Sequence, residues 1–187
     1  MTPPRAVTID TSVWIPFLRT REYARTVDPL IAAGRAWVHS VALLELYAGT
    51  ANPADARAVD AIRLAAESLG RFYHPGVEDL ILAGRVLSYW SRLRGRVRPR
   101  DHSHDLLIAI GAARTGGTLL TANARDMRRW ATVIARRSGL RLSVIAARQV
   151  PTEGFRFSLG IEASSEASRL SESCPRSRPS AHRGVTG

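Results

Sequence analysis

The sequence predicts an α/β fold, a three-layer α/β/α sandwich built on a five-stranded parallel sheet. Short apolar segments rich in β-branched residues alternate with longer helical segments between residues 6 and 145. Most of the helical segments are bounded by capping or stop residues. Strands that alternate with helices form parallel βαβ units, in which helices cover both faces of the sheet.

The predicted strands are short apolar runs between turn or capping residues, at 6–9, 36–38, 71–73, 118–121 and 140–145. The predicted helices lie between these strands; the first begins at residue 13, and the others occupy about 24–33, 41–48, 53–69, 77–93, 104–115 and 125–137. Polar residues suited to N-caps precede three helices, namely Thr11 or Ser12, Ser40, and Asn52 with Pro53 behind it. Glycines end three helices, at Gly34, Gly116 and Gly139.

The chain of 187 residues has room for one ordinary domain, which we expect to span 1–151. Residues 152–187 are rich in Ser, Glu, Arg and Pro and contain few large apolar residues after Ile161. We therefore expect this stretch to be a low-complexity, disordered tail.

The chain is strongly basic, with a net charge of +11, and all 27 basic residues are Arg. The tail contributes only +1 of this charge, from five Arg and four Glu, so the predicted domain itself is basic. A basic surface attracts polyanions, which makes nucleic acid the first partner to consider and an acidic protein the second.

The single cysteine, Cys174, excludes an intramolecular disulfide framework and a thiolate metal cluster. We find neither a signal-peptide core nor an apolar run long enough to cross a membrane. We therefore expect a cytoplasmic protein without membrane contact.

Four carboxylates, Asp10, Glu45, Asp105 and Asp126, follow a predicted strand or lie on the helix after one. In an open parallel sheet, ligands bind beyond the carboxyl ends of the strands, so these side chains are expected at one edge. Four clustered carboxylates repel one another, and a divalent cation removes that repulsion. Oxygen ligands favour Mg²⁺ or Mn²⁺, whereas the sequence lacks a cysteine set or a suitable His pair for zinc.

Each acid also has a purely structural interpretation. Asp10 could stabilise its turn, and Glu45 could form a buried ion pair with one of the many Arg. Asp105 could be a first-turn residue stabilised by the helix dipole, and Asp126 could form a capping box with Asn123.

Residues just before Asp105 could contribute to substrate binding. Five Arg stand at alternate positions in 92–100, and Arg96, Arg98 and Arg100 are candidates for contact with phosphates, although a solvated connection is the alternative. His102 and His104 are interpreted as loop and capping residues, with substrate contact or accessory base as the alternative.

Four motifs in this order resemble the PIN-domain ribonucleases, specifically VapC-like toxins of toxin–antitoxin pairs: IDTSVW at 9–14, LEL at 44–46, DLLIA at 105–109 and LTANARDM at 120–127. The resemblance covers roughly residues 5–147. It implies a PIN-like fold, Mg²⁺- or Mn²⁺-dependent cleavage of RNA, frequent homodimers, and inhibition by a small cognate antitoxin protein.

The resemblance also implies roles for individual residues. Asp10 and Asp105 match the principal metal ligands, Glu45 matches the third acid, and Ser12, Thr121 and Asn123 match supporting positions. Some family members carry the fourth acid where Asn123 stands and others where Asp126 stands, so Asp126 is the candidate in this chain. Met127 replaces the more usual Phe, and residues 130–138 are longer than the common pattern.

We therefore expect a metal-dependent endoribonuclease of the toxin type. The main alternative is a catalytically silent PIN-like scaffold that binds RNA or an acidic partner through its Arg surface. A phosphatase or phosphotransfer domain is disfavoured, because Asp10 is not followed by a second acid two residues later and the sequence has no Lys.

Overall fold

The computed structural model describes residues 6–95 and 98–147. The strands in these residues are β1 (Val7–Ile9), β2 (Ala36–His39), β3 (Phe72–Tyr73), β4 (Thr118–Thr121) and β5 (Ser143–Ala146). The helices are α1 (Thr11–Thr20), α2 (Ala24–Ala32), α3 (Ser40–Ala48), α4 (Pro53–Ser68), α5 (Val77–Arg94), α6 (Ser103–Arg114) and α7 (Ala124–Ser138), with a 3-10 turn, η1 (Pro99–Asp101), before α6. The predicted domain boundary after residue 151 and the predicted tail 152–187 lie outside the described residues.

All five strands form one parallel sheet in the order β3-β2-β1-β4-β5. Val7 of β1 pairs with Ala36 of β2, and Thr8 pairs with Leu119 of β4 on the other side. The chain builds outward from β1 to β3 and then returns to add β4 and β5. The strand order therefore reverses between β1 and β4, and ligands of such sheets bind at the carboxyl ends of the strands at this point.

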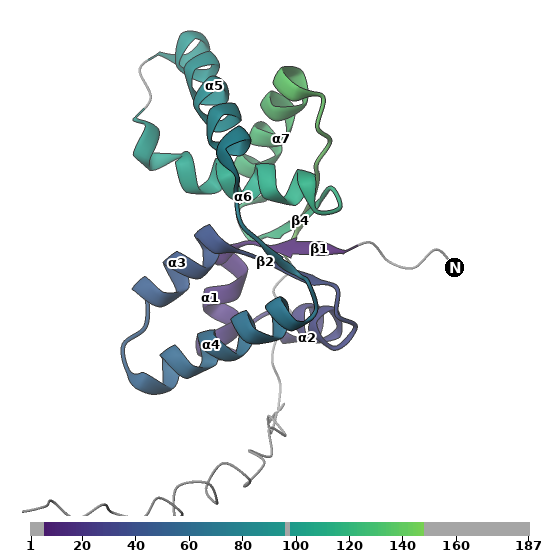
Figure 1. Ribbon diagram of the computed structural model, residues 1–187. Helices are drawn as coiled ribbons and strands as arrows, with labels where there is room; N and C mark the ends of the chain where they lie inside the picture. Colours follow the sequence, from purple (N-terminus) through teal and green to yellow (C-terminus); the bar gives the residue numbers. More distant parts are fainter. Residues whose placement is uncertain (1–5, 96–97, 148–187) are drawn as a thin grey trace, which may run out of the picture. The chain divides into compact units, whose positions relative to one another are not determined.

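Helices cover both faces of the sheet, which confirms the predicted three-layer α/β/α architecture (Figure 1). On one side, α2, α3 and α4 contact β2, and on the other α6 and α7 contact β4. The core between the layers is made of large apolar side chains without solvent access, including Ile9, Leu106, Ile110 and Leu119. Burying each such side chain stabilises the fold by about 1.5–3 kcal/mol.

Two predicted helix caps are wrong, whereas a third is confirmed. Asp10, not Thr11 or Ser12, is the N-cap of α1, and His39, not Ser40, caps α3 by accepting a hydrogen bond from Val41 N. Asn52 caps α4 as predicted. In both cases the residue that follows or ends the strand already has the extended backbone that an N-cap needs. α1 therefore begins two residues earlier than predicted and α3 one residue earlier.

Helices in the described part of the chain are too short or too polar to span a bilayer. Four strand boundaries differ from prediction by one residue or more, and the largest difference is at the start of β5. β5 begins at Ser143 rather than at Leu140, because residues 140–142 connect α7 to the strand without joining the ladder.

Candidate functional site

Asp10 lies at the carboxyl end of β1, next to β4, and is only 3% exposed. Its Oδ1 atom accepts a hydrogen bond from Thr11 N (2.8 Å), and Oδ2 accepts bonds from Ser12 Oγ (2.6 Å) and Thr121 Oγ1 (2.7 Å). Burial raises the pKa of Asp10, against the lowering effect of these three bonds, and the negative charge of Glu45 adds to the rise. A carboxylate has about four acceptor sites, so one remains for a ligand.

The Ser12 and Thr121 side chains hold both the Asp10 carboxylate and the loop that follows β4. The Ser12 hydroxyl accepts a hydrogen bond from Ala122 N (3.1 Å), and the Thr121 hydroxyl accepts one from Asn123 N (2.9 Å). The two hydroxyl oxygens lie 3.3 Å apart. These bonds set the orientation of the Asp10 carboxylate by joining the ends of β1 and β4.

Asp105 lies in the first turn of α6 and is partly buried. Its pKa is raised to about 6, first by burial and then by the negative charges of Asp10 and Glu45. Stabilisation by the helix dipole alone would lower the pKa of this carboxyl, so burial and the neighbouring acids together outweigh it. The structure therefore brings Asp10, Glu45 and Asp105 within electrostatic reach of one another.

Glu45 projects from α3 and contacts a histidine of α6. Its Oε1 atom lies 2.7 Å from Nδ1 of His104, so the partner of this carboxylate is an imidazole rather than the Arg considered from the sequence. The interpretation of His104 as a loop or capping residue is therefore wrong. The N-cap of α6 is His102, whose side chain makes no capping hydrogen bond and lies against Trp130, with ring centroids 5.5 Å apart.

Asp126 lies in the first turn of α7, where Arg129 Nη1 donates to its Oδ1 at 2.8 Å. Asn123 is the N-cap of this helix but makes no side-chain capping bond, so the capping-box interpretation is wrong. The charge of Asp126 raises the pKa of Asp105 after the stronger effects of Asp10 and Glu45. Asp126 is thus a peripheral member of the acidic group, and the exposed Asn123 side chain remains available to a ligand.

The donor atoms at this edge fit a hard divalent cation, although their present orientations do not form a complete cage. Among the described residues, no three Asp, Glu, His or Cys side chains are grouped closely enough to hold one metal ion. The contacts above give the reason, because His104 holds Glu45 and Arg129 holds Asp126. Burial, and to a smaller extent the charges of neighbouring acids, raises the pKa of both Asp10 and Asp105, and a bound cation would favour their charged forms.

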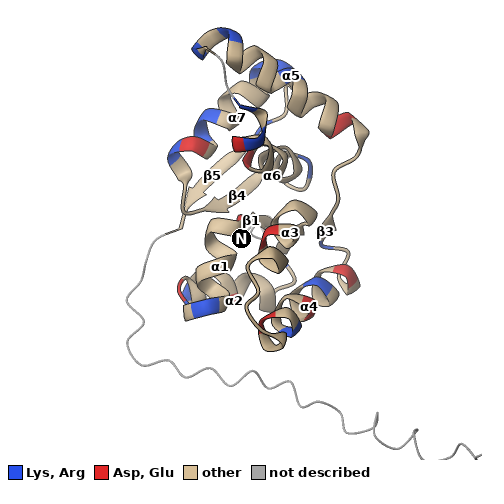
Figure 2. Ribbon diagram, turned by 90° about the vertical axis from the view of Figure 1, so that its left-hand side faces the viewer, with Lys and Arg blue, Asp and Glu red and all other residues tan. Residues whose placement is uncertain are grey.

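Arg98 and Arg100 lie in the segment just before α6 and are exposed, whereas Arg96 lies outside the described residues. The Nε atom of Arg100 is 3.5 Å from Oδ1 of the adjacent Asp101, with both side chains mostly in solvent. Figure 2 shows basic residues gathered on α7, on the end of α5 and on the segment before α6. Surface pairs of this type contribute little, so these cations remain available to an anionic ligand.

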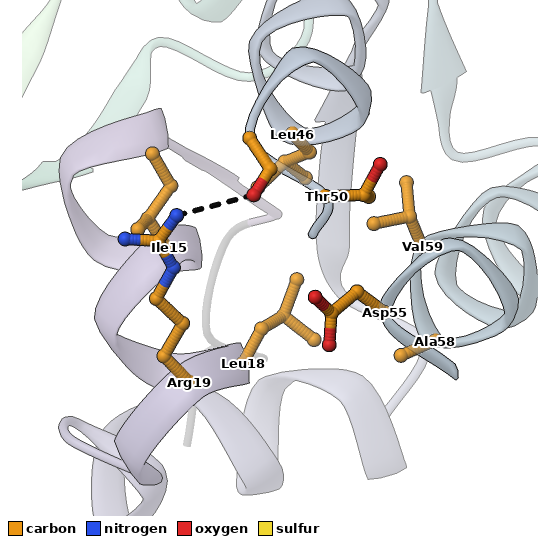
Figure 3. Close-up of a pocket in the computed structure, with 9 residues that line it drawn as sticks. Ile15, Leu18, Arg19, Leu46, Thr50, Asp55, Ala58 and Val59 are labelled. Carbon is orange, nitrogen blue, oxygen red and sulfur yellow. Dashed lines mark hydrogen bonds between the residues drawn. The ribbon is translucent and has the colours of Figure 1, made fainter. Parts of the chain in front are cut away.

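A separate hollow of about 210 Å³ lies between α1, α3 and α4 and is lined mainly by apolar side chains (Figure 3). Its two charged residues already have internal partners: Arg19 donates to Gly49 O at 3.1 Å, and Asp55 accepts from Ala51 N at 2.9 Å. None of the four acids of the sheet edge lines it. The hollow is therefore distinct from the acidic site and has no free charged group directed at a ligand.

Sequence reasoning missed the roles of His104 and His39. The only signal for His104 was its position beside Asp105, and the contact with Glu45 joins residues 59 positions apart. His39 is fully buried at the end of β2, where Nδ1 caps α3. The sequence did offer a signal for His39, because this histidine lies between a predicted strand and the predicted helix that follows it.

Comparison with known proteins places these features in a family. The PIN domain family matches residues 7–132. A solved structure of DNA-bound VapBC from Salmonella typhimurium has a chain 21% identical to this one, with a TM-score of 0.48 over 75% of this chain and 98% of that chain. VapBC2 from Rickettsia felis, bound to a promoter DNA fragment, gives 18% identity and a TM-score of 0.49 over 74% and 98%. A comparison with curated proteins gave no match. The family match covers most of the chain and the strands that carry Asp10 and Thr121, so this chain belongs to the PIN-domain family.

Proposed function

We propose that this protein is a metal-dependent endoribonuclease that acts in the cytoplasm as the toxin of a toxin–antitoxin pair. The observation that carries the proposal is the acidic edge at the reversal of strand order, where the charges of Asp10 and Glu45 raise the pKa of Asp105 and the charge of Glu45 raises that of Asp10. Membership of the PIN-domain family supports nuclease chemistry, and the VapC-like motifs support the toxin role, a small antitoxin partner and a homodimer.

Asp10 and Asp105 would hold Mg²⁺ or Mn²⁺, with Glu45 as the third ligand and Asp126 at the periphery. When bound, the metal supplies a Lewis acid that polarises the phosphodiester and lowers the pKa of water. The protein's own contribution is positional: Ser12 and Thr121 orient Asp10, and the exposed Asn123 faces solvent at the end of β4. The exposed Arg98 and Arg100, together with Arg96, would bind phosphates near the acids.

The direct test is RNA cleavage by the purified full-length protein in Mg²⁺ or Mn²⁺. Asp10→Asn and Asp105→Asn should each abolish cleavage, because each removes a charge from the metal-binding group while preserving side-chain shape. Cleavage at the unmodified rate by both variants would refute the proposal. In cells, induced expression should arrest growth, and equal toxicity of Asp10→Asn would remove nuclease activity as its cause.

A catalytically silent scaffold is the second candidate, and one observation favours it. The described acids do not form a group of three around one point, since Glu45 and Asp126 are each held by another side chain. Such a scaffold would bind RNA with a steep dependence on salt but would not cleave it in any divalent metal. Titration with Mn²⁺ separates the two candidates, because only the nuclease should lose metal binding in Asp105→Asn.

A further inference from the structure

We propose that the solvent face of α7 is a phosphate-binding track for the RNA strand as it leaves the acidic site, with Arg125, Arg128 and Arg136 as its main contacts. This inference rests on the proposed function and adds a substrate-binding surface that the family motifs do not include.

The helix α7 has two clearly separated faces. Its buried face carries Met127, Trp130, Val133 and Ile134. Positions 125, 129, 132 and 136 follow the spacing of the opposite face, and all four are exposed. At about 1.5 Å of rise per residue, the row from 125 to 136 is roughly 16 Å long. One strand of a duplex advances about 3.4 Å per phosphate, so a row of this length spans several consecutive phosphates.

The positive charge of this face is not compensated within the protein. α7 carries five Arg and one Asp, whereas α4 carries two Arg and three acids. On α4, Arg63 is paired with Glu67 at 2.8 Å. On α7, only Arg129 has an ion pair, with Asp126, and its side chain is 50% exposed. Within the described residues, Arg125, Arg128 and Arg136 have no salt bridge, so their guanidinium groups are free to bind phosphate.

The track begins beside the candidate active site. α7 begins at Ala124, three residues after Thr121, whose hydroxyl donates to Asp10 Oδ2 at 2.7 Å. The ring of His102, just before α6, packs 5.5 Å from Trp130 on the buried face of α7. The first contact places the start of α7 at the acidic site, and the second places the start of α6 against the middle of α7. Basic residues continue from there along α7 (Figure 2).

The composition of the exposed face favours a nucleic-acid strand over an acidic protein. The remaining exposed residues of α7 are Thr132, Ala135, Arg137 and Ser138, so the face has no large apolar side chain. Protein interfaces bury an apolar centre, whereas contacts to a phosphate backbone are made by cations and small polar groups. The exposed positions 125, 128, 129, 132 and 136 carry four Arg, one Thr and no acid, and such a row is suited to a polyanion.

The test measures binding of a 20-nucleotide single-stranded RNA by full-length Asp10→Asn protein in EDTA, so that cleavage cannot interfere. The α7 variant is Arg125→Gln/Arg128→Gln/Arg136→Gln. The matched control is Arg25→Gln/Arg57→Gln/Arg85→Gln, whose residues are exposed, lie on α2, α4 and α5, and have no salt bridge among the described residues. Both variants lose the same charge and leave the core untouched, and their melting temperatures verify the fold.

We expect the α7 variant to bind RNA about tenfold more weakly at 150 mM salt and the control to change by less than twofold. Each neutralised phosphate of a single strand contributes about 0.7 to the slope of log K against log salt, so three lost contacts should reduce its magnitude by about 2. Equal losses from both variants would show a general charge effect and overturn the proposal. Unchanged RNA binding by the α7 variant would also overturn the proposal. The same holds if the variant binds RNA normally but loses binding to polyglutamate, a probe for an acidic protein partner.

A second measurement distinguishes failure of the α7 track from failure of the proposed nuclease function. It compares RNA cleavage by the native protein and by the α7 variant, both with Asp10 intact. The α7 substitutions should raise KM while leaving kcat within about twofold, because they act on binding and not on the reacting group. If the protein cleaves no RNA but the α7 variant still loses RNA binding, the nuclease function fails and the track stands. If the protein cleaves RNA with an unchanged KM in the α7 variant, the track fails and the nuclease function stands.

Discussion

The Nδ1 atom of His104 lies 2.7 Å from the Oε1 atom of Glu45, so an imidazole of α6 holds a carboxylate of α3 directly beside Asp105. The two side chains are 47% and 31% exposed. An interaction at this exposure stabilises the pair by up to about 1 kcal/mol. That is enough to bias the orientation of Glu45 and too little to lock it, so a metal ion bound as proposed would compete with His104 for this carboxylate.

Replacing His104 by Ala should strengthen Mn²⁺ binding. Without the imidazole, Glu45 can turn toward the metal at no cost, and the release of about 1 kcal/mol corresponds to about a fivefold lower Kd. Calorimetric titration of the full-length protein with Mn²⁺ measures this change. Glu45→Gln is the matched control and should weaken binding, because it removes the ligand itself. Weaker binding by His104→Ala would show instead that the imidazole orients Glu45 for the metal.

Asp105→Asn should stabilise the metal-free protein at neutral pH. The folded-state pKa of Asp105 is raised to about 6 from 3.8, so folding is penalised as pH rises from about 4 to 6, and the penalty is complete above pH 6. Removing the charge should raise the free energy of unfolding at pH 7.5 by about 2 kcal/mol. Urea denaturation in EDTA at several pH values measures the difference.

The gain in Asp105→Asn should shrink toward zero at about pH 3, below both the folded pKa of about 6 and the unfolded value of 3.8, where the carboxyl is protonated in both states. A constant gain across this range would mean that the substitution acts through packing. A loss of stability at pH 7.5 would mean that Asp105 is held by favourable contacts rather than repelled by Asp10 and Glu45.

The fold was predictable because its signals are local. Each strand is a short apolar run, and Asn52 or Gly139 marks a helix end through its own backbone preference. The sequence also singled out Asp10 and Asp105 as site candidates, since a carboxylate after a buried strand or among apolar helical residues is costly without a ligand, and their role stays a prediction.

The orientations of the side chains could not be predicted, because long-range contacts set them. Glu45 reaches His104, 59 positions away, instead of one of the Arg. Even a local choice was open: Asp126 bonds to Arg129, three residues along α7, and not to the cap residue Asn123. Binary patterning specifies helices and strands, but it does not determine which of two nearby partners a surface carboxylate takes.

Protonation of His39 should destabilise the protein in mild acid. His39 is fully buried, and burial lowers its pKa to about 4, with Asp79 opposing the shift and His74 adding to it. The unfolded chain takes up the proton near pH 6.5, so stability is full above this pH and declines by about 3 kcal/mol as pH falls to 4. Asn can still accept the bond from Val41 N but does not titrate. The difference in unfolding free energy between His39→Asn and the native protein should therefore change by this amount between pH 7 and 4, and a pH-independent difference would contradict the assignment.

The close approach of α6 to His39 requires glycine at position 111. A Cβ atom at Gly111 would lie 2.4 Å from His39 Cδ2 and 2.8 Å from Tyr73 Cδ1, and Tyr73 is itself fixed by a 2.7 Å bond from its hydroxyl to Asp79. Gly111→Ala should thus lower the free energy of unfolding by about 1–3 kcal/mol, because the overpacking outweighs the higher helix propensity of Ala. The control is Gly84→Ala on α5, where a Cβ atom meets nothing within 4 Å, and it should stabilise the protein by about 0.5–1 kcal/mol. Urea denaturation compares the two, and a stabilising Gly111→Ala would show that His39 and Tyr73 can move apart without cost.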